Sequence, residues 1–167
     1  MAELTALESK IGEVLGLAMA AQDATSKVDK LVEEEGEHDD LRATLQQMAK
    51  EAKETEERTT ELASELDGKK TAILEKARET KQEATEMMST YLGDDADALD
   101  GFEFLTMAEA GELGHWEIVK TMATKAKDRP LVRLADWATP IQQGHVEAVR
   151  ASSLQLAEDE DPNELEG

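Results

Sequence analysis

The strongest constraint on the fold is a set of apolar stripes with steps of three and four residues. One stripe runs from Leu4 to Val32 and another from Leu41 to Leu66, with the spacing that places side chains on one face of an α-helix. Residues 1–129 contain no proline, so nothing there forces a helix to break. The pattern predicts long amphipathic helices that short turns join into antiparallel neighbours.

The stripes predict one all-α domain over residues 1–157, an antiparallel four-helix bundle with an additional crossover helix between its second and third long helices. Helices are expected at residues 4–35, 39–66, 69–92, 96–127 and 130–157. The helix at 69–92 has a thin apolar stripe and an opposite face of Lys and Glu, so we expect it on the outside of the bundle. The acidic residues 158–167 are expected to form a disordered tail.

Charge and composition exclude several functions. The formal net charge is −21, which repels nucleic acid and anionic membrane surfaces. The chain has no cysteine, so disulfides, thiolate zinc sites and cysteine catalysis are excluded. No apolar run approaches the roughly 18 residues of a membrane span, and the N-terminus lacks the order of a signal peptide. We therefore expect a cytoplasmic protein that binds neither nucleic acid nor membranes.

Acidic and imidazole side chains interrupt the third long helix where its core stripe should be apolar. Glu109 and Glu112 both fall on that stripe, and His115 follows three residues after Glu112. Side chains at i and i+3 share a helix face, and Glu-x-x-His on a bundle helix is how ferritin-like proteins hold paired iron or manganese. On the next helix His145 follows Gln142 with the same spacing. Glu109, Glu112, His115 and His145 are therefore candidate metal ligands.

Two alternatives explain the same residues without a metal. The stripe could rotate slightly, so that Leu113 points inward and Glu109 outward. Alternatively, Glu112 and His115 could pair with each other or with Lys and Arg side chains.

The first two long helices offer weaker candidate ligands. A paired-metal site needs carboxylates from these helices too, but the position nearest the stripe on the first helix is Gln22, which brings no charge. On the second helix Glu51 and Glu54 flank a seam of Met48, Ala52 and Thr55. Two divalent ions would be poorly neutralised by this set.

Three segments resemble a known family. These are the turn Leu66–Lys70, the segment Gly114-His115-Trp116-Glu117-Ile118 and the final helix ending Leu154–Ala157. They resemble the bacterial stress-associated ferritin-like proteins of the YciE/YciF type, over about residues 4–157. The resemblance implies a ferritin-like bundle that holds a di-iron-like centre and takes part in stress responses.

Several departures from the family pattern fall on its presumed ligands. His115 and Glu117 match, but Gly114 stands where the family has Glu. Gln22 stands where the first helix has Glu, and Gln142 lies where the last helix is rich in Glu. The resemblance therefore implies a degraded metal site more than a changed fold.

Two functions follow as expectations. The first is a stress-associated ferritin-like protein with a vestigial or altered iron or manganese site between the third and fourth long helices, and the sequence leaves open whether it is an enzyme. Such a site would handle oxygen or peroxide. The second is a non-catalytic scaffold or interaction protein that binds no metal and needs no cofactor. In both cases we expect a homodimer.

Overall fold

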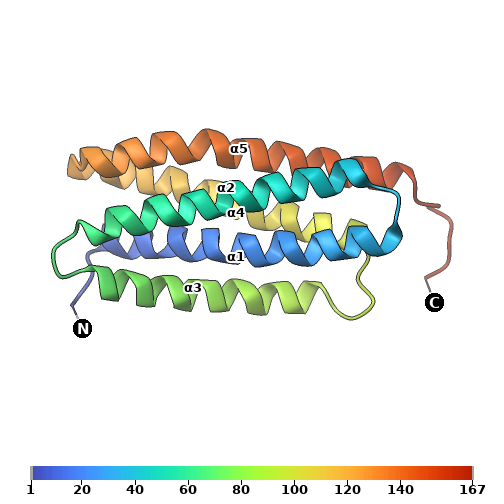
Figure 1. The fold of residues 1–167 in the computed structure, drawn as a ribbon, viewed down its shortest axis with the longest axis horizontal. Helices are drawn as coiled ribbons and strands as arrows, with labels where there is room; N and C mark the ends of the chain where they lie inside the picture. Colours follow the sequence, from blue (N-terminus) through green and yellow to red (C-terminus); the bar gives the residue numbers. More distant parts are fainter. Residues whose placement is uncertain (1, 167) are drawn as a thin grey trace.

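The computed structural model describes residues 2–166 and contains five α-helices and no strand in that range (Figure 1). Each helix begins and ends within two residues of the range that the apolar periodicity predicts, and the expectation of an all-α chain is confirmed. The helices are α1 (Ala6–Glu35), α2 (Asp39–Ser64), α3 (Lys70–Tyr91), α4 (Ala98–Ala126) and α5 (Arg129–Glu158).

Short polar residues define where the helices start. Thr5 accepts a hydrogen bond from the backbone N–H of Glu8, whose carboxylate accepts one from the N–H of Thr5. Asp97 and Asp100 form the same reciprocal pair before α4. Each pair satisfies two backbone groups that a helix N-terminus otherwise leaves without a partner. At the other end of α1, Gly36 has φ 79°, a left-handed conformation that glycine adopts without steric cost.

The helices form two antiparallel hairpins joined by α3 (Figure 1). The pairs α1–α2 and α4–α5 are the hairpins. In the sequence α3 lies between them, and in space it runs back along the length of the bundle beside α1, so that α4 points in the same direction as α2. The most extensive packing is between α4 and α5, followed by that of α1 against α2 and α3. By contrast, α3 scarcely touches α4.

Two apolar clusters fill the interior, one toward each end of the bundle. In α4 the residues of one cluster end at Leu105 and those of the other begin at Trp116. In α5 the corresponding gap lies between Ala138 and Val149. The buried polar side chains between the clusters belong to the middle of these helices. They include Glu109, Glu112, Gln142 and His145.

Glycines on α1 allow α3 to approach closely. A Cβ atom added at Gly12 would lie 2.7 Å from the side chain of Lys76. One added at Gly16 would overlap the carbonyl oxygen of Ala77 and lie 2.7 Å from Thr80. The short distance between the two helices therefore depends on these glycines, and α3 rests on α1 instead of on α4.

None of the described helices combines the length and the apolar character needed to cross a membrane. Residues 159–166 follow α5 outside any helix. The expected disorder of the tail stays a prediction, and its last residue, Gly167, lies outside the described residues.

Candidate functional site

A layer of polar side chains crosses the middle of the bundle between the two apolar clusters. Glu109 and Glu112 of α4 are 1% and 4% exposed, so both acids are buried as the core stripe predicts. The rotated arrangement, with Glu109 outward, does not occur. Gln142 and His145 of α5 are buried beside them, which places four of the sequence-derived candidates within one layer.

Glu109 is held from α5 by two side chains. The amide Nε2 of Gln142 donates both to the carbonyl oxygen of Glu109, at 3.0 Å, and to its carboxylate. The Nδ1 atom of His145 lies 3.5 Å from the same carboxylate oxygen, Oε2. Gln142 and His145 are three residues apart and therefore share the face of α5 that meets α4. The buried carboxylate of Glu109 thus has the donors that its burial requires.

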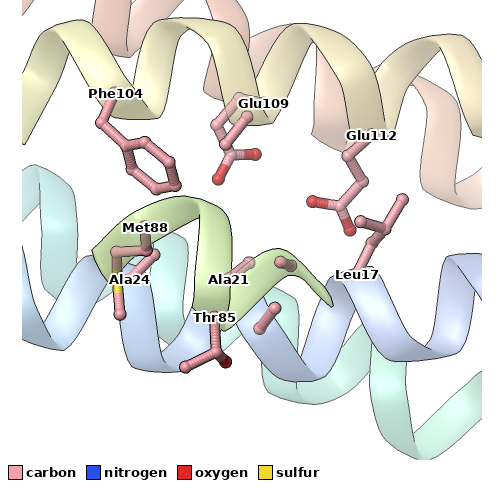
Figure 2. Close-up of a pocket in the computed structure, with 11 residues that line it drawn as sticks. Leu17, Ala21, Ala24, Thr85, Met88, Phe104, Glu109 and Glu112 are labelled. Atoms are coloured by element: carbon pink, nitrogen blue, oxygen red, sulfur yellow. The ribbon is translucent and has the colours of Figure 1, made fainter. Parts of the chain in front are cut away.

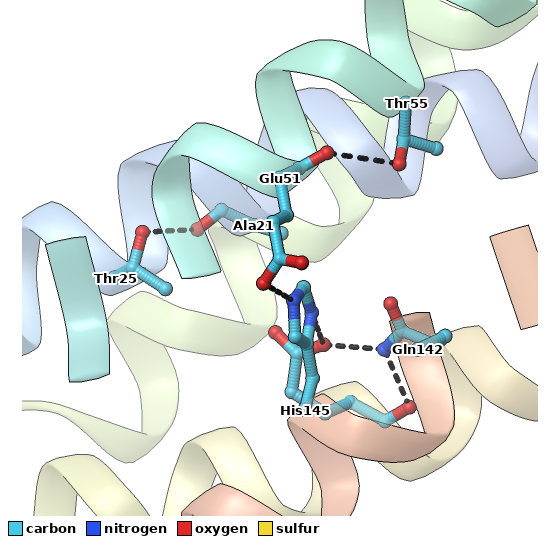
Figure 3. A network of polar contacts seen from close by, with 7 residues as sticks. Ala21, Thr25, Glu51, Thr55, Gln142 and His145 are labelled. Carbon is cyan, nitrogen blue, oxygen red and sulfur yellow. Dashed lines mark hydrogen bonds and ion pairs between the residues drawn. The ribbon is translucent and has the colours of Figure 1, made fainter. Parts of the chain in front are cut away.

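His145 also contacts α2 on the other side of its ring. Its Nε2 atom lies 3.2 Å from Oε1 of the half-buried Glu51 (Figure 3). Burial by itself would lower the pKa of His145, but the hydrogen bonds and negative charges of Glu109 and Glu51 outweigh it and raise the pKa above its usual value. We define the group of Glu51, Glu109, Gln142 and His145 as the α2–α4–α5 cluster, in which a cationic imidazole is stabilised between two carboxylates.

Glu112 has a different environment, although it lies one turn from Glu109. Among the described residues no side chain or backbone group donates a hydrogen bond to its carboxylate, and no cation pairs with it. Burial, and then the charge of Glu109, raise the pKa of Glu112 well above its usual value. Both acids line a cavity of about 40 Å³, enough for about one water molecule. The other walls of this cavity are mostly apolar (Figure 2).

His115 does not join the α2–α4–α5 cluster. Its Nδ1 atom lies 2.8 Å from the carbonyl oxygen of Gly111, one turn back on α4. Its Nε2 atom lies 3.7 Å from the carboxylate of Glu13 on α1. The alternative pairing of His115 with Glu112 is absent from the contacts of residues 2–166, and the spacing of the motif did not reveal Glu13 as the neighbour of His115.

The weaker candidates are divided between the cluster and the surface. Gln22 donates to Glu56 of α2 at 2.6 Å and also to the carbonyl oxygen of Ala18. Glu54 is exposed and pairs with Arg58 one turn later. Glu117 is exposed. Only Glu51 and Gln142, of the weaker set, contact the stronger candidates.

The donor set does not fit a two-ion centre. Within residues 2–166 no three His, Asp or Glu side chains are grouped so that they could hold one metal ion. Glu51 and Glu109 contact opposite nitrogens of the His145 ring. An ion bound to one of these nitrogens could therefore be reached by only one of the two carboxylates. The amide of Gln142 occupies the α4–α5 interface, where the metal was expected.

Two surface openings reach this layer. One, of about 550 Å³, lies between α2 and α5 and is lined by Glu51, His145 and Pro140 among others. The second, of about 230 Å³, lies between α3 and α4, with Leu17 of α1 contributing, and reaches Glu112 and His115. We call the second opening the α3–α4 slot. Each polar region of the layer is thus accessible from a different side of the molecule.

No family model matches this chain, and neither a curated protein nor a solved structure matches it. The candidate function of this protein therefore depends on the geometry of its buried polar layer.

Proposed function

We propose that this protein is a non-catalytic interaction protein built on a ferritin-like bundle, in which the buried polar layer is structural. The chain direction supports the ferritin-like arrangement, since two antiparallel hairpins are joined by one long connection. In this proposal α3 is the crossover helix. The α2–α4–α5 cluster then holds three helices in register at the place where ferritin-like proteins bind their metals.

The observation that carries this proposal is the position of His145. Both of its ring nitrogens are directed at carboxylates, Glu109 at 3.5 Å and Glu51 at 3.2 Å. A metal ligand must be a neutral imidazole with one free nitrogen, whereas this environment favours the protonated ring, which has none. Both carboxylates of the cluster contact the imidazole of His145, and these contacts form without an added ion.

Metal analysis of protein purified without chelator tests the proposal. We expect fewer than about 0.1 equivalents of iron, manganese and zinc together. Adding Mn²⁺, Fe²⁺ or Zn²⁺ should leave the thermal midpoint unchanged, because an ion that does not bind the folded state cannot stabilise it. One equivalent of bound metal in the wild-type protein that disappears in His145→Ala would contradict the proposal.

A second candidate function is binding of a single iron or manganese ion that handles oxygen or peroxide, as in a stress-associated ferritin-like protein. The observation that favours it is that Glu109 and Glu112 line one small cavity. These two acids would hold the ion, and the chemistry it supplies would be that of a redox metal with open positions. In this case Glu112→Gln should lower the thermal midpoint of metal-loaded protein and leave that of metal-free protein unchanged.

We further propose that the protein is a homodimer. Exposed apolar side chains, among them Ile118 and Leu154, offer surface that a second copy would cover. Light scattering should then give about twice the chain mass of 18.3 kDa. A mass equal to that of one chain would contradict this.

A further inference from the structure

The α3–α4 slot contains a buried carboxylate for which the protein supplies no partner. Glu112 is 4% exposed and has neither a hydrogen-bond donor nor a cation among the described residues. No fully buried polar side-chain atom in residues 2–166 lacks a partner, so the Glu112 oxygens must border accessible space. The lining of the slot includes Glu112, so this carboxylate can be reached from outside through it.

Apart from Glu112 and His115, the lining of the slot is mostly apolar. Phe104, Met107 and Tyr91 provide large side chains, and the rings of Tyr91 and Phe104 lie 6.0 Å apart. Small residues make the space between them, with Ala84 on α3 and Ala108 on α4. Apolar walls around one charged group are typical of sites for small organic ligands.

The slot and the small interior cavity adjoin each other. Both are lined by the same five residues, which are Leu17, Ala84, Phe104, Ala108 and Glu112. Figure 2 shows the carboxylates of Glu109 and Glu112 directed from α4 into the space that faces α1 and α3. A ligand in the slot would therefore place its inner end beside two acids.

We propose that the α3–α4 slot binds a small amphipathic organic cation, a primary ammonium group on a short hydrocarbon body. The ammonium group would donate hydrogen bonds to Glu112 and supply the cationic partner that this carboxylate lacks among the described residues. The hydrocarbon would pack against Leu17, Phe104 and Met107. At about 30 Å³ for each water-sized group, a volume of about 230 Å³ holds a ligand of roughly seven heavy atoms.

A small molecule fits this site better than a docked protein helix does. The Glu112 carboxylate lies below the surface side chains, whereas a helix with its side chains is about 10 Å wide and would have to stay at the rim. The exposed Met87 and Tyr91 at that rim would instead cover the hydrocarbon end of a short ligand. The inference goes beyond the proposed function and concerns a part of the polar layer that the α2–α4–α5 cluster does not use.

Calorimetric titration of the full chain with n-hexylamine tests the inference. The protein should first be shown to be metal-free, so that no metal ion occupies the space beside Glu112. The titration then tests amine binding separately from the proposal that the protein binds no metal. Salt at 0.5 M would screen the general attraction of an acidic surface for cations. We expect saturable binding of one equivalent with a Kd below about 1 mM, at least about tenfold tighter than that of 1-hexanol.

Two glutamate variants separate recognition by Glu112 from nonspecific attraction, and a third variant tests the volume of the slot. Glu112→Gln should weaken hexylamine binding by at least about tenfold, whereas Glu117→Gln, on the exposed face of the same helix, should leave it unchanged. Ala108→Leu should fill the slot and abolish binding of the amine while circular dichroism remains helical. Equal affinities for the amine and the alcohol, equal losses in the two glutamate variants, or no binding by the wild-type protein would each overturn the proposal.

Discussion

Glu109 and Glu112 are two acids of one helix, one turn apart and almost equally buried, but their surroundings differ. Glu109 has partners on α5, which supplies the amide of Gln142 and the imidazole of His145. Glu112 faces α3 and α1, where the walls are apolar and no donor reaches it. The comparison shows that burial alone does not define the role of a carboxylate. Its role depends on what the neighbouring helix presents to it.

The packing of α3 explains much of this difference. Where α4 meets α5 the helices are in close contact, and polar groups on each can bond to the other. Because α3 instead rests on the glycines of α1 and scarcely touches α4, a slot remains beside Glu112. Glu109, which has hydrogen-bond donors on α5, is thus part of the core. Glu112, which has none among the described residues, lies at the inner end of the α3–α4 slot.

The largest expected effect comes from replacing each acid with leucine. Glu109→Leu should lower the free energy of unfolding by about 3 kcal/mol, since it removes the buried carboxylate that both Gln142 and His145 contact. Glu112→Leu should raise it by about 1–3 kcal/mol, because it removes a buried carboxyl group that has no hydrogen-bond donor or cation among the described residues. Urea unfolding monitored by circular dichroism would measure both. Changes of the same sign would remove the distinction between the two acids.

The two histidines allow a matched test of the α2–α4–α5 cluster. His145→Ala should destabilise the protein by about 3 kcal/mol, because Glu109 stays buried after losing its cationic partner. His115→Ala should cost less than about 0.5 kcal/mol, as expected for a partly exposed side chain outside a buried network. Chemical denaturation of the two variants in the same buffer compares them. Similar losses would mean that the cluster contributes no special stability.

A pair of glycine variants probes the position of α3. Gly16→Ala should destabilise the protein by about 2 kcal/mol, because the new methyl group overlaps the backbone of α3 at Ala77. Gly114→Ala, on α4 with open space around it, should stabilise by about 0.5–1 kcal/mol through its helix propensity. Thermal unfolding would resolve the opposite signs. If Gly16→Ala were also stabilising, close packing on α1 would not explain the slot.

The free energy of unfolding should depend on pH in two ranges, one set by Glu112 and one set by His145. Within each range the free energy changes by at most about 1.4 kcal/mol per pH unit for one group. The pKa of Glu112 is raised well above 4.5 by burial and by Glu109, so its stabilising contribution is complete below pH 4.5 and decreases as the pH rises toward its folded pKa. The pKa of His145 is raised from 6.5 because its acidic partners outweigh burial. Its contribution is complete below pH 6.5 and is lost as the pH rises through the folded value.

Unfolding free energies from pH 4.5 to 9 would separate these ranges. Glu112→Leu should remove the loss of stability that begins near pH 4.5, while His145→Ala should remove the loss that begins near pH 6.5. The acidic surface is common to all variants, so differences from the wild-type protein isolate each group. Curves parallel to the wild-type curve would show that neither residue titrates in the way described.

The helices and the burial of the two acids could be predicted from the sequence, whereas the partners of the acids could not. Steps of three and four residues report which side of a helix faces the core, which is why Glu109 and Glu112 were correctly expected inside. The contact of His145 with Glu51 joins residues 94 positions apart. No pattern within one helix reports such a pair, and Glu51 only flanks the stripe of its helix.

Local physical chemistry therefore determined the all-α chain, the ends of its helices and the presence of acids and imidazoles in a buried layer. These features follow from hydrogen bonds and side-chain periodicity within about one turn of helix. Only the tertiary structure decided that Gln142 and His145 turn toward Glu109, that His115 turns toward Glu13, and that Glu112 borders a slot. The reason is that rotation and spacing of packed helices depend on contacts between distant segments, such as the fit of α3 against Gly16.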